Sequence, residues 1–225
     1  SPFYTVYGGT QDNSTQGGPS RTDSSNGIRN ADWFITLFAD GHQPATEPGN
    51  PSIMYSEWQQ GNLVRVDRTT GERVYIQPQP EPGDPPDRFN WDAPILVSPH
   101  SPKRLYYASQ RVWRSDDRGD GWRAVSGDLT RNQDRMTLPF MGRQWSWDSP
   151  WDMVAMSSFN TVTSLAESPK AEGLLYAGTD DGKVWRSINA GGAWTDISAG
   201  LPKRYVTRVV PDPADPMGVY VTHSG

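Results

Sequence analysis

The chain has 225 residues, a formal net charge of −5 at pH 7 and no cysteine. Its basic residues are scattered rather than striped, which argues against nucleic acid as a partner. The sequence contains no run of about 18 apolar residues, the length that spans a membrane. Because cysteine is absent, disulfides and thiol catalysis are excluded. The 22 Gly, 20 Pro and 10 Trp residues favour short strands joined by turns, and no window has the apolar spacing of a helix.

The first segment, from Tyr7, reads Tyr-Gly-Gly-Thr-Gln-Asp-Asn, and the segment from Tyr176 matches it position by position as Tyr-Ala-Gly-Thr-Asp-Asp-Gly. Residues 13–30 follow and are rich in Ser, Gly and Asn, which predicts a long polar loop where later units have a tight hairpin. The strand pattern already begins at residue 3. We therefore expect the chain to be a piece of a longer protein.

A second motif, Pro-x-x-Pro-x-x-apolar-Tyr, ends at Tyr55, Tyr106 and Tyr220, and a copy ending at Tyr176 has Glu in place of the second Pro. Proline suits a connection between strands, because its missing N–H is not needed there. Each copy follows a short apolar segment. We expect these segments to be the first strands of four units, at residues 34–38, 94–97, 162–165 and 206–210.

A third motif, Val-Trp-Arg-Ser followed by the pattern Ser-x-Asp/Asn-x-Gly-x-x-Trp, occurs twice. Its side chains suit a tight hairpin: the Asp or Asn accepts from turn N–H groups, the Gly supplies an unusual backbone conformation, and the Trp covers the turn. We interpret these residues as structural, on the outer rim of the fold. They are Ser115, Asp117, Gly119, Trp122, Ser187, Asn189, Gly191 and Trp194.

The motif tyrosines at positions 7, 55, 106, 176 and 220 are 48, 51, 70 and 44 residues apart. Four-stranded repeats of this length predict an all-β fold, a β-propeller segment of four to five blades in one domain. The expected parts are a partial blade at 1–30, blades at 31–78, 88–130 and 160–200, a linker at 79–87, an insertion at 131–159 and a partial blade at 201–225. Incomplete end blades leave open edges, so we expect either a homo-oligomer or missing blades of a longer chain.

The hairpin pattern resembles the Asp-box, also called the bacterial neuraminidase repeat. With the segments at 7–13, 32–33, 90–94 and 173–182, the chain resembles a family of long bacterial propeller proteins that are similar to sortilin receptors and often labelled glycosyl hydrolases. The resemblance implies a propeller fold and export to the periplasm or the cell exterior. It leaves function open, because one fold carries many activities.

Functional groups of a propeller are expected where the inner strands and their loops meet the central channel. The insertion gathers three Trp, two Asp and one Arg, which suits a sugar: flat faces for stacking and acids for hydroxyls or catalysis. The alternative is a loop whose Trp residues pack on neighbouring blades. The predicted ligand-binding residues are Arg88, Trp91, Arg143, Trp145, Trp147 and Trp151, and the predicted catalytic residues are Asp92, Asp148 and Asp152.

Oxygen ligands at equivalent blade positions could hold a calcium ion in the channel, and such an ion could polarise a phosphoryl or lactone oxygen. The candidate ligands are Asp12, Asp32, Asn90 and Asn160. Polar caps on strand ends are the alternative. Zinc fits less well, because the three His residues lie in unrelated loops.

We predict a binding or scaffold module that contacts a protein, a peptide or a glycan. The alternative is a hydrolase, either a glycoside hydrolase or a calcium-assisted hydrolase of phosphoesters or lactones. A glycoside hydrolase needs two carboxyl groups about 5–10 Å apart across a cleft, so Asp92 with Asp148 or Asp152 is the pair to examine. A binding module would instead show an open surface lined by Trp.

Overall fold

The computed structural model describes residues 3–149 and 158–224, and this part of the chain forms 17 strands in five antiparallel sheets. The first sheet contains β1 (Thr5–Gly9), β2 (Thr15–Pro19) and β3 (Phe34–Leu37). The second contains β4 (Ala45–Glu47), β5 (Asn50–Trp58), β6 (Asn62–Asp67) and β7 (Arg73–Tyr75). The third contains β8 (Ile95–Val97), β9 (Leu105–Ala108), β10 (Val112–Ser115) and β11 (Arg123–Ala124).

The fourth sheet contains β12 (Val162–Glu167), β13 (Leu175–Thr179), β14 (Val184–Ser187) and β15 (Thr195–Asp196). The fifth contains β16 (Val206–Pro211) and β17 (Val219–His223). Two short 3-10 helices, η1 (Asn30–Asp32) and η2 (Arg135–Thr137), lie in connections. No helix among the described residues is long and apolar enough to cross a membrane.

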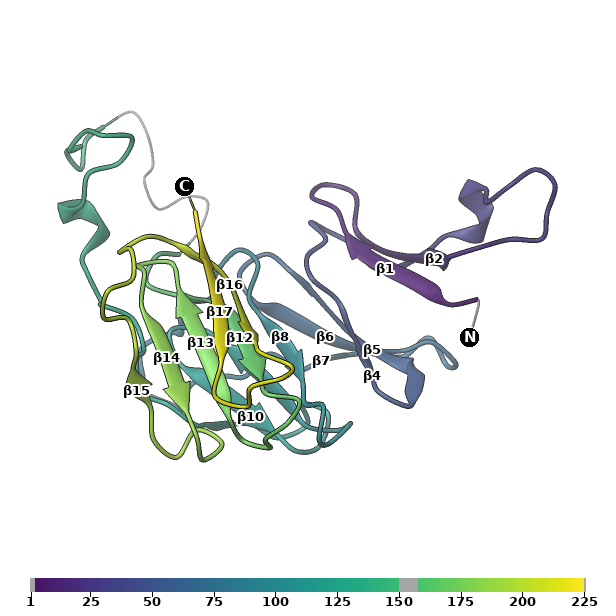
Figure 1. The fold of residues 1–225 in the computed structure, drawn as a ribbon. Coiled ribbons are helices and arrows are strands. Elements are labelled where there is room, and N and C mark those ends of the chain that lie inside the picture. Colours follow the sequence, from purple (N-terminus) through teal and green to yellow (C-terminus); the bar gives the residue numbers. More distant parts are fainter. Residues whose placement is uncertain (1–2, 150–157, 225) are drawn as a thin grey trace.

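Every sheet is built from strands that follow one another in sequence, and the sheets stack in chain order through shared apolar cores. Figure 1 shows β1–β3 at one end of this row, away from β16 and β17. The end sheets have three and two strands where the middle sheets have four. The fold is therefore all-β and propeller-like with incomplete end blades, as the repeats predict.

The cores form because both faces of a middle sheet are apolar. Tyr107 packs toward the second sheet, whereas its neighbour Tyr106 packs toward the fourth. Tyr55 and Met54 divide in the same way between the third sheet and the first. Successive side chains of a strand point to opposite faces, so a continuous apolar run covers both sides of the sheet.

The prediction for residues 34–38 was wrong. This segment forms β3, and its Phe34 pairs with Gly17 of β2, so it is the last strand of the first sheet. The first strand of the second sheet is β4 instead. The polar loop after β2 returns the chain to its own sheet, and an apolar segment before a Pro motif does not show which neighbour it pairs with. The predicted first strands at 94–97, 162–165 and 206–210 correspond to β8, β12 and β16.

The two Ser-x-Asp/Asn-x-Gly-x-x-Trp hairpins have the same internal hydrogen bonds. Ser115 Oγ accepts from Gly119 N at 2.8 Å and donates to Asp117 Oδ1 at 2.7 Å, and Ser187, Asn189 and Gly191 repeat the arrangement. Gly119 has φ +90°, and a Cβ there would lie 2.6 Å from Ile76 Cδ1. A residue with a Cβ at this position would have a strained backbone and would have to displace the side chain of Ile76.

The hairpin tryptophans join neighbouring sheets. Trp122 Nε1 donates to the carbonyl of Ile76, the residue after β7, at 2.7 Å. Trp194 Nε1 donates to the carbonyl of Val125, the residue after β11, at 2.9 Å. The second sheet has no Trp at this point, and Arg73 Nε donates to Thr36 O of the first sheet at 3.1 Å instead. Each outer strand is thereby bonded to the sheet before it.

We expect Trp122→Phe to lower the free energy of unfolding by about 1–2 kcal/mol, because the Ile76 carbonyl loses its donor while most of the apolar contact remains. This corresponds to a fall in Tm of roughly 2–8 °C, measured by calorimetry. Trp147→Phe is the matched control, because Trp147 is 87% exposed and belongs to no strand. Equal Tm values for the two variants would contradict a stabilising role for the bond between sheets.

Candidate functional site

A pocket of about 670 Å³ lies where inner strands and the loops that lead into them meet. All five sheets contribute to its wall, through β1, the loops before β4 and β8, strand β12, and the start of β16. Its polar and glycine lining comprises Tyr7, Gly8, Gly9, Gly41, His42, Gln43, Asp92, Thr163, Tyr205, Thr207 and Arg208. We refer to it as the channel pocket.

Asp92 supplies the pocket's carboxylate, and its side chain is 56% exposed. Its Oδ1 accepts from Gln43 N at 3.4 Å and lies 3.9 Å from Nδ1 of His42, whose ring meets Trp91 edge-on at 6.5 Å. Arg208 Nη1 donates to Oε1 of Gln43 at 3.3 Å. A negative and a positive side chain therefore flank Gln43 on the pocket wall.

A second carboxyl group, Glu57 on β5, lies beside Asp92 and is fully buried. Tyr107 donates its hydroxyl to Glu57 Oε2 at 2.5 Å, whereas Oε1 has no hydrogen-bond partner within the described part of the chain. Burial raises the pKa of Glu57 well above its ordinary value, and the neighbouring charge of Asp92 raises it further. Burial therefore favours the protonated, neutral form of Glu57.

A buried polar network forms the wall behind the pocket. Asn90 Nδ2 donates to Thr161 Oγ1 at 2.9 Å, and Thr161 donates through Oγ1 and N to the carboxylate of Asp180 at 2.8 and 3.0 Å. Burial raises the pKa of Asp180 to about 7 against these hydrogen bonds. Burial likewise raises the pKa of Tyr205 to about 12, so that its phenol stays a neutral donor at the pocket.

Two other predicted residues hold loops rather than face the pocket. Arg88 forms an ion pair with Asp128 at 2.7 Å and donates through Nε to Asn160 O at 3.2 Å. The Asn160 side chain exchanges two hydrogen bonds with the backbone of Gln133, at 2.7 and 2.9 Å. These contacts join the loops before β8 and β12 with the chain that follows the third sheet.

The described part of the insertion projects from the sheets (Figure 1). Arg143 lies over the ring of Trp145 at 4.7 Å, and Trp145 donates to the carbonyl of Phe140 at 2.9 Å. Asp148 accepts from Ser146 within the same segment. No contact within residues 3–149 or 158–224 joins Asp148 to Asp92. Trp151 and Asp152 lie outside the described residues.

The candidate calcium ligands lie in separate settings. Asp12 donates through its backbone to Asp40 Oδ1 at 2.8 Å, and Asp32 Oδ2 accepts from Arg29 N at 2.7 Å. Asn90 and Asn160 make the bonds given above. Within the described residues, no group of three or more His, Cys, Asp or Glu side chains is arranged to hold a metal ion. The calcium site expected from equivalent blade positions therefore stays a prediction.

The sequence analysis did not identify Glu57, Tyr107, His42, Tyr205 or Arg208 as site residues. One signal was available for Glu57: it stands two positions after Tyr55 on an apolar strand and so shares a face with a core tyrosine. A carboxyl group on a core face indicates a buried acid with an unusual pKa. His42 and Arg208 carry no comparable local signal.

No protein-family model and no curated protein matches the chain. Its fold is similar to a solved structure described as the extracellular domain of a one-component system from B. thetaiotaomicron, with TM-score 0.59, 12% identity, and coverage of 97% of this chain and 25% of that chain. It is also similar to the GH74 xyloglucanase from Xanthomonas campestris (TM-score 0.56, 14% identity, coverage 99% and 34%). Sqt1 from Chaetomium thermophilum is a third similar structure, with TM-score 0.54, 14% identity, and coverage of 93% of this chain and 48% of that chain. At these identities the likeness shows the fold alone, and the chain spans between a quarter and about half of each.

The buried acid makes stability depend on pH. Because the pKa of Glu57 is higher in the folded state, the folded chain binds more protons than the unfolded chain between the ordinary value of 4.5 and the raised one. We expect the free energy of unfolding to fall as the pH rises through this window and Glu57→Gln to reduce that fall; the remainder comes from Asp180, whose raised pKa acts with the same sign. Urea denaturation at a series of pH values from 4.5 to 8 measures it.

Glu172→Gln is the comparison variant. The neighbouring Arg104 lowers the pKa of Glu172, so the contribution of Glu172 to the free energy of unfolding changes with pH in the opposite direction. Its stabilising contribution is present above pH 4.5 and is lost as the pH falls through the lowered pKa. A Glu57→Gln profile parallel to that of the unsubstituted chain would show that Glu57 titrates normally.

Proposed function

We propose that the chain is the ligand-binding part of an exported propeller protein and that the channel pocket binds a neutral glycan segment. The observation that carries the proposal is the composition of the pocket wall, to which all five sheets contribute polar groups around Asp92. Sugar hydroxyls both donate and accept hydrogen bonds. They therefore need acceptors and donors on facing walls, and this pocket has both.

The acceptor is Asp92, which can take hydrogen bonds from two neighbouring hydroxyls. The donors are the Arg208 guanidinium and the neutral phenol of Tyr205. The hydroxyl of Thr163 donates to the carbonyl of Val206 at 2.6 Å and can accept from a ligand. The ring of Trp91 packs against His42 behind this wall. Export is supported by the extracellular origin of one solved neighbour. The insertion, with the exposed Trp147, offers a second contact surface for a longer ligand.

We expect Asp92→Asn to weaken glycan binding by roughly 10- to 100-fold, the loss of about 1.5–3 kcal/mol for a hydrogen bond to a charged group. Calorimetric titration with a panel of neutral oligosaccharides, including xyloglucan fragments, measures the affinity. Asp148→Asn makes the same change on the projecting segment and should leave pocket binding unchanged. Failure of the unsubstituted chain to bind any glycan, or equal affinity for Asp92→Asn, would refute the proposal.

Hydrolysis is the second candidate, favoured by the buried Glu57 beside Asp92, whose pKa is raised by burial. Two carboxyl groups that differ in protonation are the usual acid and base of hydrolases. However, Glu57 is fully buried, so it can reach a substrate only through Asp92.

Release of reducing ends separates the two candidates. We expect the chain to bind xyloglucan fragments without cleaving them, because no second exposed carboxyl group within the described residues faces Asp92 across the pocket. Incubation followed by chromatography of the products checks this. Cleavage that Asp92→Asn abolishes would replace the binding role with a hydrolase.

A further inference from the structure

A pocket of about 360 Å³ lies between the turn from β5 to β6 and the proline-rich segment at residues 77–87. We refer to it as the linker pocket, and it shares no lining residue with the channel pocket. Gln77 Nε2 donates to the carbonyl of Gln60 in the turn at 3.2 Å, which joins the two walls. Phe89 also lines the pocket, and it packs so closely on Gly61 that a Cβ there would lie 2.4 Å from the ring.

Asp87 gives the linker pocket a buried carboxyl group. Its side chain is 1% exposed, and Oδ1 accepts from Arg111 Nε at 2.9 Å and from Gln110 Nε2 at 2.7 Å. Oδ2 has no hydrogen-bond partner within the described residues. A buried carboxylate oxygen without a donor costs free energy, and a ligand that donates to it would recover that cost. One oxygen of Asp87 is therefore fixed by the protein, and the other still lacks a donor.

The rest of the lining offers acceptors without a cationic donor. Within the described residues, the charged side chains that line the pocket are Asp84 and Asp87, both acidic. Three of the lining residues are prolines, which have a carbonyl but no N–H. The segment at 78–87 contains three acidic residues and no Lys or Arg. This composition favours a ligand group that is positively charged and donates hydrogen bonds.

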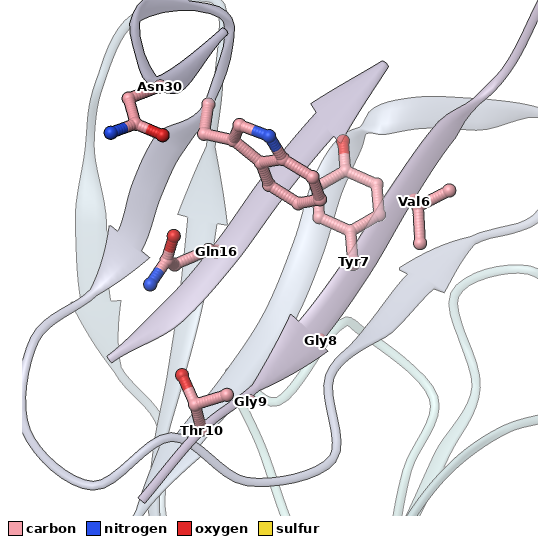
Figure 2. A pocket seen from close by; sticks show the side chains of 8 residues that line it. Val6, Tyr7, Gly8, Gly9, Thr10, Gln16 and Asn30 are labelled. Carbon is pink, nitrogen blue, oxygen red and sulfur yellow. The ribbon is translucent and has the colours of Figure 1, made fainter. Parts of the chain in front are cut away.

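A pocket on the first sheet, which we call the first-sheet pocket, lacks these charged groups. Its volume is about 420 Å³, and Figure 2 shows Val6 and the glycine backbone of β1 on its wall, with the amides of Gln16 and Asn30 nearby. No residue of its lining, within the part of the chain that the structure describes, is charged. The molecule therefore contains an uncharged reference pocket of comparable size.

We propose that the linker pocket binds an aliphatic primary ammonium group, the chemistry of a lysine side chain, with an N–H donating to Oδ2 of Asp87. A primary ammonium has three donors and no acceptor, so it matches the acceptors of this lining. Pro78, Pro80 and Phe89 provide apolar surface for the methylene groups behind the charge. Asp84, which is exposed, adds a second negative charge to the lining.

A calcium ion is the competing occupant, because it also binds carboxylate and amide oxygens. Calcium takes about six to eight oxygen ligands. Within residues 3–149 and 158–224, no group of three or more His, Cys, Asp or Glu side chains is arranged to hold a metal ion. Oδ1 of Asp87 already accepts from two donors, so Asp87 offers a ligand one oxygen. The linker pocket therefore suits a group that needs one strong acceptor and an apolar surface.

NMR titration with Nα-acetyl-lysine amide tests the proposal. We expect the side-chain amide signals of Gln60, Gln77 and Gln79 to shift, while those of Gln16 and Asn30 in the first-sheet pocket stay unchanged. The Nε-acetylated probe keeps the methylene groups but loses the charge, so it should not bind. Glucosamine, an ammonium without an aliphatic stem, should bind at least about fourfold more weakly, the effect of one buried methylene group.

Three variants locate the interaction. Asp87→Asn should weaken binding of the lysine probe roughly 10- to 100-fold, because it replaces Oδ2 by a donor and keeps an acceptor for Arg111 and Gln110. Asp84→Asn changes an exposed residue, so folding is preserved, and it should weaken binding about two- to fivefold. Asp23→Asn makes the same change in the exposed loop between β2 and β3 and should leave binding unchanged.

Four results would each overturn the proposal. The first is the absence of any shift of the three glutamine signals with the lysine probe. The second is equal affinity for the Nε-acetylated probe, and the third is equal or tighter binding of glucosamine. The fourth is a shift produced by calcium chloride and not by the lysine probe. If Asp87→Asn does not fold, the acetylated probe and Asp84→Asn still decide the question.

Discussion

The structure depends on the coverage of each sheet face by the next sheet. A four-stranded sheet that is apolar on both faces is not stable by itself in water, because burial of apolar surface provides the main favourable free energy of folding. Stacking in chain order supplies the cover, and side-chain hydrogen bonds at the outer strands join the second, third and fourth sheets each to the one before, through Arg73, Trp122 and Trp194. The hairpin motif is therefore best understood as part of the junction between sheets and only secondarily as a turn.

The same stacking builds the channel pocket. Neighbouring sheets are fixed at their outer strands, so their inner strands and the loops that precede these strands converge on the pocket. Polar residues from distant parts of the sequence become neighbours there. Gln43 and Arg208 are 165 positions apart and still form a hydrogen bond there. The position of a residue in its repeat, rather than its local sequence, decides whether it reaches the pocket. A pocket formed in this way is lost when any one sheet is displaced.

This division explains what the sequence could predict. The repeats predicted the all-β stack, because each motif is local: a Ser, an Asp and a Gly within five residues determine a hairpin. They failed at Phe34, because strand pairing depends on the length of the loop before it and not on the strand's own composition. They also missed Glu57 and Arg208, whose roles arise only after sheets far apart in sequence have met. The aromatic cluster of the insertion stays a predicted sugar site, and its described contacts lie within the segment itself.

Glu57 shows how the scaffold and the site impose opposite demands on one residue. A fully buried carboxyl group, one oxygen of which has no partner among the described residues, costs stability that an apolar residue at the same place on β5 would not. The cost is reduced by protonation and by the hydroxyl of Tyr107, a core residue of the third sheet. The raised pKa of Glu57 favours its neutral form, which spares the exposed carboxylate of Asp92 the repulsion of a second negative charge. We therefore interpret the buried acid as support for Asp92. At the junction between the second and third sheets, the apolar core directly adjoins the wall of the pocket.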